Sequence, residues 1–492
     1  MARKSNHTGL KIFLILLMLL FLAGAAFMVK LCIDIVDQPV VRDPAPTDVT
    51  IQLPEPTIEE TEAPPETTLP VPEHVVATAT ISSTGDLLMH LPVVNTGRQS
   101  DGTYDFENIF RHLTEYTTAT DYAVANLETT LYGTGKPWSG FPNFNCPDEI
   151  VDSAKEAGFD MLLTANNHSF DTGLDGYIRT LDVIQEKGLE TLGTMRDETE
   201  PKWIIEDING IQIGMICYTY ETSNGTNTYP ALNGLPMYGA TYENVNCFHE
   251  NRLDSFYTEI DGYLREMEEA GAEATMVYIH WGVEYQLTQN AKQSEIAQKL
   301  CDLGVDVIIG GHPHVVQPMD LLESTVDPDH KTVCLYSMGN AVSNQRLGNL
   351  SMVSTAHTED GVLFSVTFCK YSDGTVYLQS TDLLPTWVYR NANFAPGEYN
   401  ILPLDQETRD QWGEKYQIPE NVVTSAGKSY DRTMAIVGEG LTECQTWLAD
   451  EEAAREQYYY DLAFFPEKFA TEATEATEAT EPAEVTEETV AP

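Results

Sequence analysis

The stretch Val305-Asp306-Val307-Ile308-Ile309-Gly310-Gly311-His312-Pro313-His314 changes from an apolar run to glycines and histidines within a few residues. The apolar part, residues 305–309, predicts a buried strand. Two histidines that follow a strand directly lie at its carboxyl end, where open α/β sheets hold their ligands. This stretch therefore predicts an α/β fold with a functional site at the strand ends.

The same change from apolar to polar residues occurs at three other places. In each, a strand-like segment is followed at once by side chains that can bind a metal ion. Together they offer carboxylate, amide and imidazole groups, a mixture that suits two borderline or hard divalent ions better than a closed structural zinc site. We therefore expect one metal site. The segments are Ala77–Ser82 before Gly85-Asp86, Met161–Leu163 before Ala165-Asn166-Asn167-His168, and Thr275–Ile279 before His280-Trp281-Gly282-Val283-Glu284.

Amphipathic helices are expected between these strands, so residues 76–390 predict an α/β domain. The last strands lack intervening helices, which favours antiparallel additions that close a second sheet. Residues 391–466 carry Trp412, Trp447 and Tyr458-Tyr459-Tyr460 and are expected to pack on the domain as helices. The expected helices are Ile150–Ala157, Gly176–Glu186, Leu253–Ala270 and Gln293–Leu303, and the further strands are Tyr122–Asn126, Ile211–Tyr218, Val333–Ser337, Val362–Cys369 and Val376–Leu383.

Residues 223–246 are rich in Asn, Gly, Thr, Pro and Tyr and show no periodicity. A loop of this length inside a compact domain is usually functional or disordered. Its side chains Tyr229, Pro236, Tyr238 and Tyr242 suit a lid or a substrate wall. A loop without such a role fits the composition equally well.

The first 36 residues predict where the protein resides. Arg3, Lys4 and Lys11 precede an apolar run over residues 12–29, long enough to approach a hydrocarbon core of ~30 Å. Positive charge before such a run predicts a cytoplasmic N-terminus and an extracytoplasmic main domain. We therefore expect a single-pass cell-membrane anchor over residues 1–36. The small residues Ala23-Gly24-Ala25 also allow a cleaved signal peptide.

Two acidic segments flank the predicted domain. Residues 37–75 contain nine prolines and nine acidic residues but one base, Arg42, which predicts a disordered stalk. Residues 467–492 contain a Thr-Glu-Ala repeat and predict a disordered, low-complexity tail. The formal net charge of −49 argues against nucleic acid as a partner, because phosphate binding needs basic patches. The eight cysteines lack Cys-x-x-Cys spacing and indicate no zinc ribbon.

The candidate ligands follow from their positions after strands. Asp86 lies in a turn after the first strand, and Glu128 adds a second carboxylate after residues 122–126. His312 and His314 are two residues apart, so they point to one face if the chain is extended, or fork around an ion if it turns. Four other histidines, His112, His249, His330 and His357, have no such context and are expected to be surface or packing residues.

The order of these motifs resembles the CapA-type proteins of poly-γ-glutamate capsule synthesis, a branch of the calcineurin-like metallophosphoesterase superfamily. The resemblance covers about residues 78–345. It implies a four-layer αββα sandwich with two metal ions at the strand ends. The motifs that carry it are Gly85-Asp86, Asn126-Leu127-Glu128, Asn166-Asn167-His168 with Asp171 and Gly173, His280-Trp281-Gly282-Val283-Glu284, Gly311-His312-Pro313-His314-Val315 and Ser337-Met338-Gly339-Asn340.

The resemblance also implies roles for individual residues. His168 would contact a phosphate or a leaving group, and Asp171 would orient it as carboxylates orient imidazoles beside metal sites. The cofactor would be two divalent ions, with manganese, zinc and iron as candidates. The implied metal ligands are Asp86, Glu128, Asn167, His280, His312 and His314, and the supporting residues are His90, Asn126, Glu284 and Asn340.

Two positions depart from the superfamily pattern. Leu88 stands where an Asp-x-His motif has histidine, and His90 would replace that histidine only in a tight turn. Glu128 stands where a bridging aspartate is usual. Two functions therefore stay open. One is a membrane-anchored component of poly-γ-glutamate synthesis or export that binds the anionic polymer or other capsule-synthesis proteins. The other is a metal-dependent hydrolase, phosphoesterase-like, acting on a cell-envelope polymer or its precursor.

Overall fold

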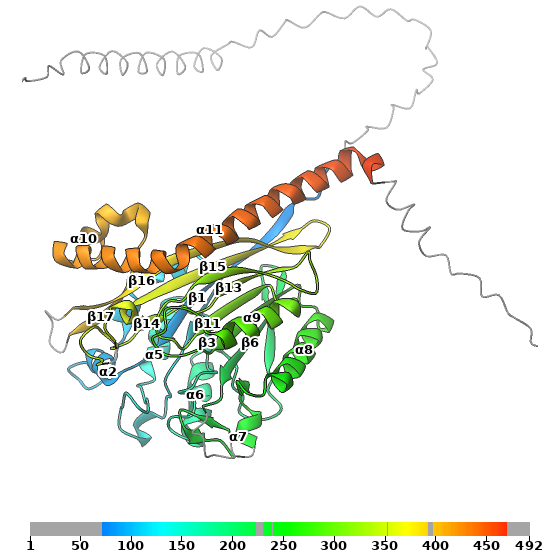
Figure 1. Cartoon of the computed structure of the whole chain (residues 1–492). Helices are drawn as coiled ribbons and strands as arrows, with labels where there is room; N and C mark the ends of the chain where they lie inside the picture. Colours follow the sequence, from blue (N-terminus) through cyan, green and yellow to red (C-terminus); the bar gives the residue numbers. More distant parts are fainter. Residues whose placement is uncertain (1–70, 223–229, 239, 352, 392–396, 470–492) are drawn as a thin grey trace, which may run out of the picture. The chain divides into compact units, whose positions relative to one another are not determined.

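Two β-sheets form the centre of the domain (Figure 1). Within the part of the chain that the structure describes, the first sheet has eight strands, in the order β17 (Glu398–Pro403), β16 (Val376–Asn391), β15 (Asp360–Tyr371), β1 (Val75–Leu87), β2 (Tyr122–Asn126), β3 (Met161–Leu163) and β4 (Glu190–Leu192), with β14 (Asn340–Val342) beside β1. The second, counted over the same residues, has seven, in the order β12 (Met319–Glu323), β13 (Lys331–Leu335), β11 (Val307–Gly311), β10 (Ala274–His280), β6 (Ile211–Tyr220) and β5 (Trp203–Ile208), with β9 (Cys247–Phe248) beside β6.

The computed structural model describes residues 71–222, 230–238, 240–351, 353–391 and 397–469. The predicted anchor, most of the predicted stalk and nearly all of the predicted tail lie outside these residues. Among the described residues, no helix is both long and apolar enough to cross a membrane. All described elements belong to one unit of the chain, residues 69–492.

The central strands bury both of their faces, as the period-two alternation of side chains shows. Val124 of β2 lies in a core shared by both sheets, whereas its neighbours Ala123 and Ala125 lie in a second core on the outer side. In β10, Met276 lies in the shared core and Val277 in a third core on the other outer side. The sheets therefore pack face to face, and each needs a cover on its outer face.

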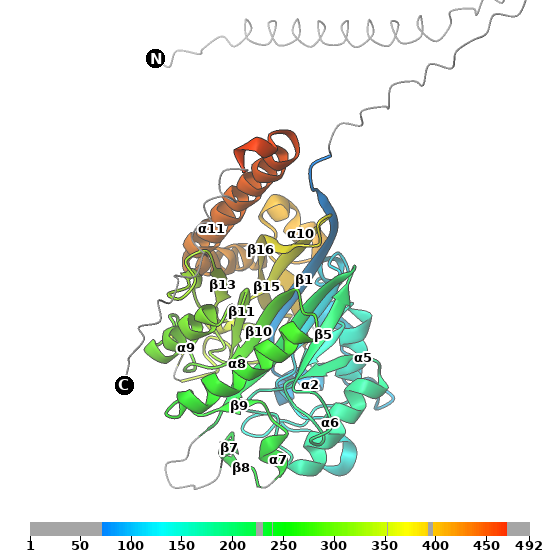
Figure 2. The same ribbon diagram turned by 90° about the vertical axis from the view of Figure 1, so that its right-hand side faces the viewer.

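Helices provide this cover, as the two views show (Figures 1 and 2). The outer core of the first sheet includes side chains of α3 (Glu107–Phe110), α5 (Glu149–Glu156) and α6 (Leu174–Glu186), and that of the second includes α8 (Leu253–Glu269) and α9 (Ala291–Asp302). The four predicted helices are confirmed. The start of α9 is determined by a capping box, in which Asn290 accepts from the backbone of Gln293 and the Gln293 side chain accepts from that of Asn290. The protein is thus a mixed α/β domain with two sheets.

The late strands confirm our expectation only in part. We expected antiparallel additions that close a second sheet, and β13 does join the second sheet, where it pairs antiparallel with β12. β15 and β16 are antiparallel as well, but β15 pairs with β1, with Thr367 opposite Thr80, so these two strands extend the first sheet. The reason is that β1 has parallel β2 on one side only, and its other edge offers unpaired backbone groups. Periodicity does not reveal which edge a later strand joins.

Residues 391–466 were expected to form helices, but they also form β17. The rest is dominated by α11 (Glu420–Phe464), a helix of 45 residues that follows the short α10 (Trp412–Lys415). Val437, Leu441 and Cys444 of α11 enter the core shared by both sheets. Since α11 contacts both β16 and β12, it closes one side of the sandwich (Figure 1). The remaining short helices are α2 (Leu91–Thr96), α4 (Thr114–Thr117) and α7 (Ala240–Glu243).

Arg432 of α11, which is partly exposed, forms an ion pair with the buried carboxylate of Asp360, the first residue of β15. Its Nε lies 2.8 Å from Asp360 Oδ2 and its Nη2 lies 2.6 Å from Oδ1, and the Asp360 side chain is 2% exposed. Removing one partner of such a pair leaves a buried charge. We expect Arg432→Ala to lower the free energy of unfolding at pH 8 by ~3–5 kcal/mol.

The loss should depend on pH. Burial raises the pKa of Asp360 to about 6, although Arg432 and Ser429 oppose this. Because this folded-state pKa lies above the ordinary value of 3.8, ionisation of Asp360 disfavours the folded state as the pH rises from about 4 to about 6. At pH 5 the Asp360 carboxyl is mostly protonated in the folded state, so removing Arg432 leaves a mostly neutral group. Denaturant unfolding should therefore show that Arg432→Ala loses less free energy of unfolding at pH 5 than at pH 8. Arg265→Ala, which breaks an exposed pair with Asp261, is the control; equal losses for Arg432→Ala at both pH values would contradict the prediction.

Candidate metal centre

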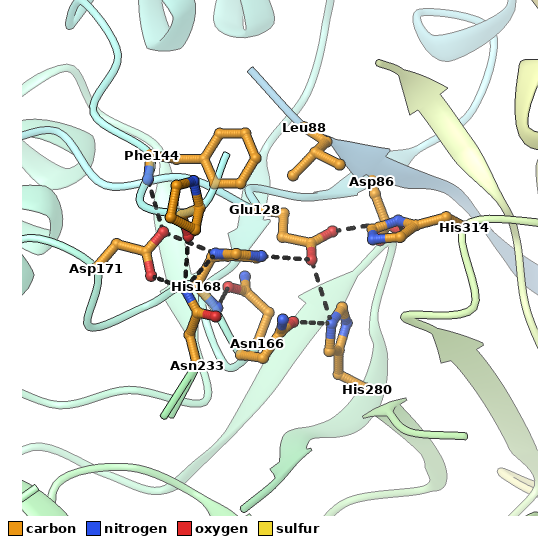
Figure 3. A network of polar contacts seen from close by, with 12 residues as sticks. Asp86, Leu88, Glu128, Phe144, Asn166, His168, Asp171, Asn233, His280 and His314 are labelled. Carbon is orange, nitrogen blue, oxygen red and sulfur yellow. Dashed lines mark hydrogen bonds and ion pairs between the residues drawn. The ribbon is translucent and has the colours of Figure 1, made fainter. Parts of the chain in front are cut away.

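Strand ends from both sheets meet at one site (Figure 3). Asp86 is the penultimate residue of β1, and Glu128 follows β2 by two residues. His280 ends β10, and His312 directly follows β11. β1 and β2 are parallel in the first sheet and β10 and β11 are parallel in the second. The four polar stretches therefore do come together, but at the shared edge of two sheets rather than in the crevice of one.

Five of these side chains form two overlapping groups of three. Glu128, His280 and His312 make the first group, and Asp86, Glu128 and His314 make the second. Within each group the possible ligand atoms all lie within 4.8 Å of one another, and every residue is buried. Glu128 belongs to both groups, so its two oxygens are placed between two potential ion positions.

Glu128 is buried without a hydrogen-bond partner for either oxygen, and His312 Nδ1 likewise has none. The nearest bases are His280 Nε2 at 3.6 Å from Oε1 and His314 Nδ1 at 3.8 Å from Oε2, beyond hydrogen-bond distance. A buried carboxylate without partners is costly. Carboxylate and imidazole donors left free in this way fit divalent metal ions.

Burial shifts the pKa values of these side chains in different directions. Burial, reinforced by the Asp86 carboxylate, raises the pKa of Glu128 well above its usual range. Burial lowers the pKa of His280 to about 3 and that of His312 well below its usual range. For Asp86, burial acts to raise the pKa, but the hydrogen bond and charge of His314 outweigh it and lower the pKa. His280 and His312 are thus held neutral, the form that binds a metal.

The loop after β11 has an unusual backbone. A Cβ on Gly310 would lie 2.0 Å from the carbonyl oxygen of Tyr336, so only glycine fits there. His312 has φ of 96° and His314 has φ of 56°, values that residues other than glycine rarely adopt. Such residues cost ~1–3 kcal/mol each and cluster at functional sites. The strain therefore supports a functional role for this loop.

Amides surround the two groups. Asn167 Oδ1 lies 2.8 Å from His280 Nε2, so the predicted amide ligand lies beside the first group. Asn126 Nδ2 donates to Asp86 Oδ1 at 2.8 Å, and Asn340 Nδ2 donates to the carbonyl of His314 at 3.1 Å. Asn126 and Asn340 thus contact predicted ligands from outside the groups, where supporting residues are expected.

His168 lies next to the two groups but belongs to neither. Its Nδ1 lies 2.7 Å from Asp171 Oδ2, and its Nε2 lies 3.9 Å from Glu128 Oε1 (Figure 3). The Phe144 ring packs nearly perpendicular to the imidazole ring, with the centroids 4.6 Å apart. The ring is therefore held on one side by Asp171 and faces the candidate metal centre on the other.

The structure places two predicted supporting residues outside the groups. His90 Nδ1 lies 3.3 Å from the carbonyl oxygen of Leu88 and 3.3 Å from the backbone nitrogen of Asn344. Burial lowers the pKa of His90 to about 4. Glu284 is half-buried in the loop after β10. His90 therefore does not join the ligand groups in place of the histidine that is missing at Leu88, and Leu88 itself is buried.

Sequence reasoning missed Asn233. It lies at the tip of a hairpin formed by β7 (Ala231–Leu232) and β8 (Leu235–Pro236), and its Nδ2 lies 2.8 Å from Asp171 Oδ1. The sequence does contain a pattern that predicts this turn, because Asn233-Gly234 between two short apolar pairs is typical of a hairpin. Part of the segment that we expected to be either a lid or substrate wall, or a loop without such a role, therefore contacts the site.

The sequence model of the bacterial capsule synthesis protein family PGA_cap matches residues 80–345, more than half of the chain. The chain belongs to this family. The match contains every residue of the two groups, together with His168, Asp171 and Asn233. The resemblance to CapA-type proteins is thereby confirmed.

Two curated relatives of this PGA_cap protein share about a quarter of its residues over the aligned part. The capsule biosynthesis protein CapA of Bacillus anthracis is 27% identical over 271 residues, which are 54% of this chain and 60% of the relative. The PGA biosynthesis protein CapA of Bacillus subtilis (strain 168) is 26% identical over 270 residues, 54% of this chain and 63% of the relative. The similarity therefore spans less than two thirds of either relative.

Proposed function

We propose that this PGA_cap protein is a membrane-anchored, extracytoplasmic component of poly-γ-glutamate capsule synthesis or export, and that it works through a two-metal centre. Family membership and the names of the two relatives support the capsule role. The apolar run over residues 12–29 supports the anchor. The proposal includes a metallophosphoesterase-like αββα sandwich, supported by two sheets with helices on both outer faces.

The observation that carries the metal centre is the Glu128 carboxylate, buried without partners and shared by two ligand groups. One ion would be held by Glu128, His280 and His312, with Asn167 beside them. The other would be held by Asp86, Glu128 and His314. When bound, two such ions supply positive charge that stabilises an anionic oxygen group.

The charge of the protein makes this centre important for binding. The chain carries a net charge of −49, and a polyglutamate chain is also an anion. The two repel each other unless cations lie between them. Polymer binding should therefore require the loaded metal centre.

A second function, metal-dependent hydrolysis of a phosphoester or related bond, is supported by His168. This histidine lies outside both ligand groups, and Asp171 holds its Nδ1. Its Nε2 faces the centre and is placed to exchange a proton with a bound substrate. Asp171 stabilises the ring in this orientation.

Metal content tests the proposal. We expect the full chain, purified without chelator, to contain about two divalent ions, as two-metal sites do. The His312→Ala/His314→Ala double variant, which loses one ligand from each group, should lose both ions and the binding of polyglutamate. A wild-type protein that binds no manganese, zinc or iron after reconstitution would contradict the metal centre. Retained polymer binding by the metal-free variant would contradict the proposed role of the ions.

A further inference from the structure

Asn233 contacts the His168–Asp171 pair from a separate segment of the chain. It has φ of 46° and is followed by Gly234 with φ of 70°, as expected for a tight hairpin turn. Its Nδ2 lies 2.8 Å from Asp171 Oδ1 and 2.7 Å from the carbonyl oxygen of Pro142. Figure 3 shows Asn233 beside both Asp171 and His168. Both hydrogens of this amide group therefore have acceptors.

These contacts determine which nitrogen of His168 carries the hydrogen. His168 Nδ1 lies 3.3 Å from Asn233 Nδ2 and 2.7 Å from Asp171 Oδ2. An amide nitrogen has two hydrogens and accepts none, and the two hydrogens of Asn233 are already donated elsewhere. Nδ1 would thus have no donor if it were an acceptor, so it carries a hydrogen and donates to Asp171. Nε2 is left facing Glu128 and the metal centre.

Asp171 accepts hydrogen bonds from segments that follow strands of both sheets. The backbone nitrogen of Phe144, in the loop after β2 of the first sheet, donates to Oδ2 at 2.7 Å. Asn233, in the segment after β6 of the second sheet, donates to Oδ1. Asn143 Nδ2 is more distant, at 3.5 Å from Oδ1. Asn233 therefore provides the short hydrogen bond that fixes the second oxygen of this carboxylate.

We propose that Asn233 is a positioning residue, which orients Asp171 and thereby holds His168 in the tautomer with hydrogen on Nδ1 and Nε2 directed at the metal centre. This inference rests on the proposed hydrolytic function for its kinetic consequences. It extends that function to the β7–β8 hairpin, because His168 Nε2 is directed at the metal centre to exchange a proton only when Asn233 orients Asp171.

Two substitutions test the proposal. Asn233→Gly keeps a residue suited to positive φ and removes the amide, and Asn233→Asp keeps the shape but replaces the donor with a carboxylate beside Asp171. Asn209→Gly is the matched control, because Asn209 also has positive φ, precedes a glycine in a hairpin and donates from Nδ2, but to Thr78 and away from the site. All variants are made in the full chain.

The first measurement is the ¹⁵N spectrum of the His168 ring at fixed pH in the metal-loaded protein. We expect hydrogen on Nδ1 in the wild type and in Asn209→Gly, and a mixture of tautomers in Asn233→Gly. The second is the kcat/KM for a phosphoester, which should fall about 10–100-fold in Asn233→Gly, mainly through kcat. Metal content should not change. In an Asp171→Asn background, Asn233→Gly should cause little further loss, because it acts through Asp171.

An unchanged tautomer in Asn233→Gly would overturn the proposal. So would a loss of metal equal to the loss of activity, which would show a general structural role. A wild-type protein that hydrolyses no phosphoester would contradict the hydrolytic function alone, since the ring spectrum does not depend on turnover and still decides the role of Asn233.

Discussion

Replacing Glu128 by glutamine is expected to remove most of the bound divalent metal. Glu128 is the one residue shared by both ligand groups, and an amide cannot provide two anionic oxygens to two ions. We expect about two ions per chain in the wild type and fewer than one in Glu128→Gln, measured by elemental analysis. This is a larger effect than the loss of a histidine that belongs to a single group.

Thermal unfolding gives a second measurement of the same change. Metal that binds only the folded state should stabilise the wild type by ~3–4 kcal/mol at 100 to 1,000 times its dissociation constant. Glu128→Gln should gain little. Glu284→Gln is the matched control, because Glu284 is a half-buried carboxylate nearby but outside both groups. Two ions retained in Glu128→Gln, or lost equally in Glu284→Gln, would show that Glu128 does not bridge.

Replacing His168 by alanine is expected to abolish turnover and leave the metal in place. General acid or base groups contribute about 10²–10⁴-fold to rate, and His168 lies outside both ligand groups. We therefore expect kcat for a phosphoester to fall by about that factor, with unchanged metal content and polyglutamate binding. The control is His357→Ala, because the Nδ1 of His357 contacts the exposed side chain of Thr355.

The same variant separates the two proposed functions in cells. If capsule production is lost with His168→Ala as well as with His312→Ala, hydrolysis is required for capsule formation. If it survives His168→Ala but fails with His312→Ala, the centre acts in binding or assembly. Loss of metal in His168→Ala would contradict the placement of His168 outside the ligand set.

Much of the site was predictable because its residues are local in sequence. Polar residues that directly follow an apolar strand must lie at a sheet edge, so Asp86, His280 and His312 were found from their positions alone. The helices α5, α6, α8 and α9 were predicted to within a few residues, because their apolar faces repeat along the chain. The resemblance to the capsule family then connected these local signals.

Contacts between distant segments were not predictable in this way. The hydrogen bond of Asn233 to Asp171 joins residues 62 apart in sequence, and the pairing of β15 with β1 joins residues almost three hundred apart. The sharing of Glu128 by two ligand groups is likewise a property of the packed sheets. No periodicity along the chain encodes such distances.

The sequence by itself determined the strands that carry the site, the helices α5, α6, α8 and α9 and the identity of the polar residues at the strand ends, because these depend on local patterns of apolar and polar side chains. The tertiary structure decided which sheet each strand joins, which oxygens remain without partners and which nitrogen of His168 faces the centre. These depend on the packing of two sheets against each other, which brings together side chains that no local pattern relates.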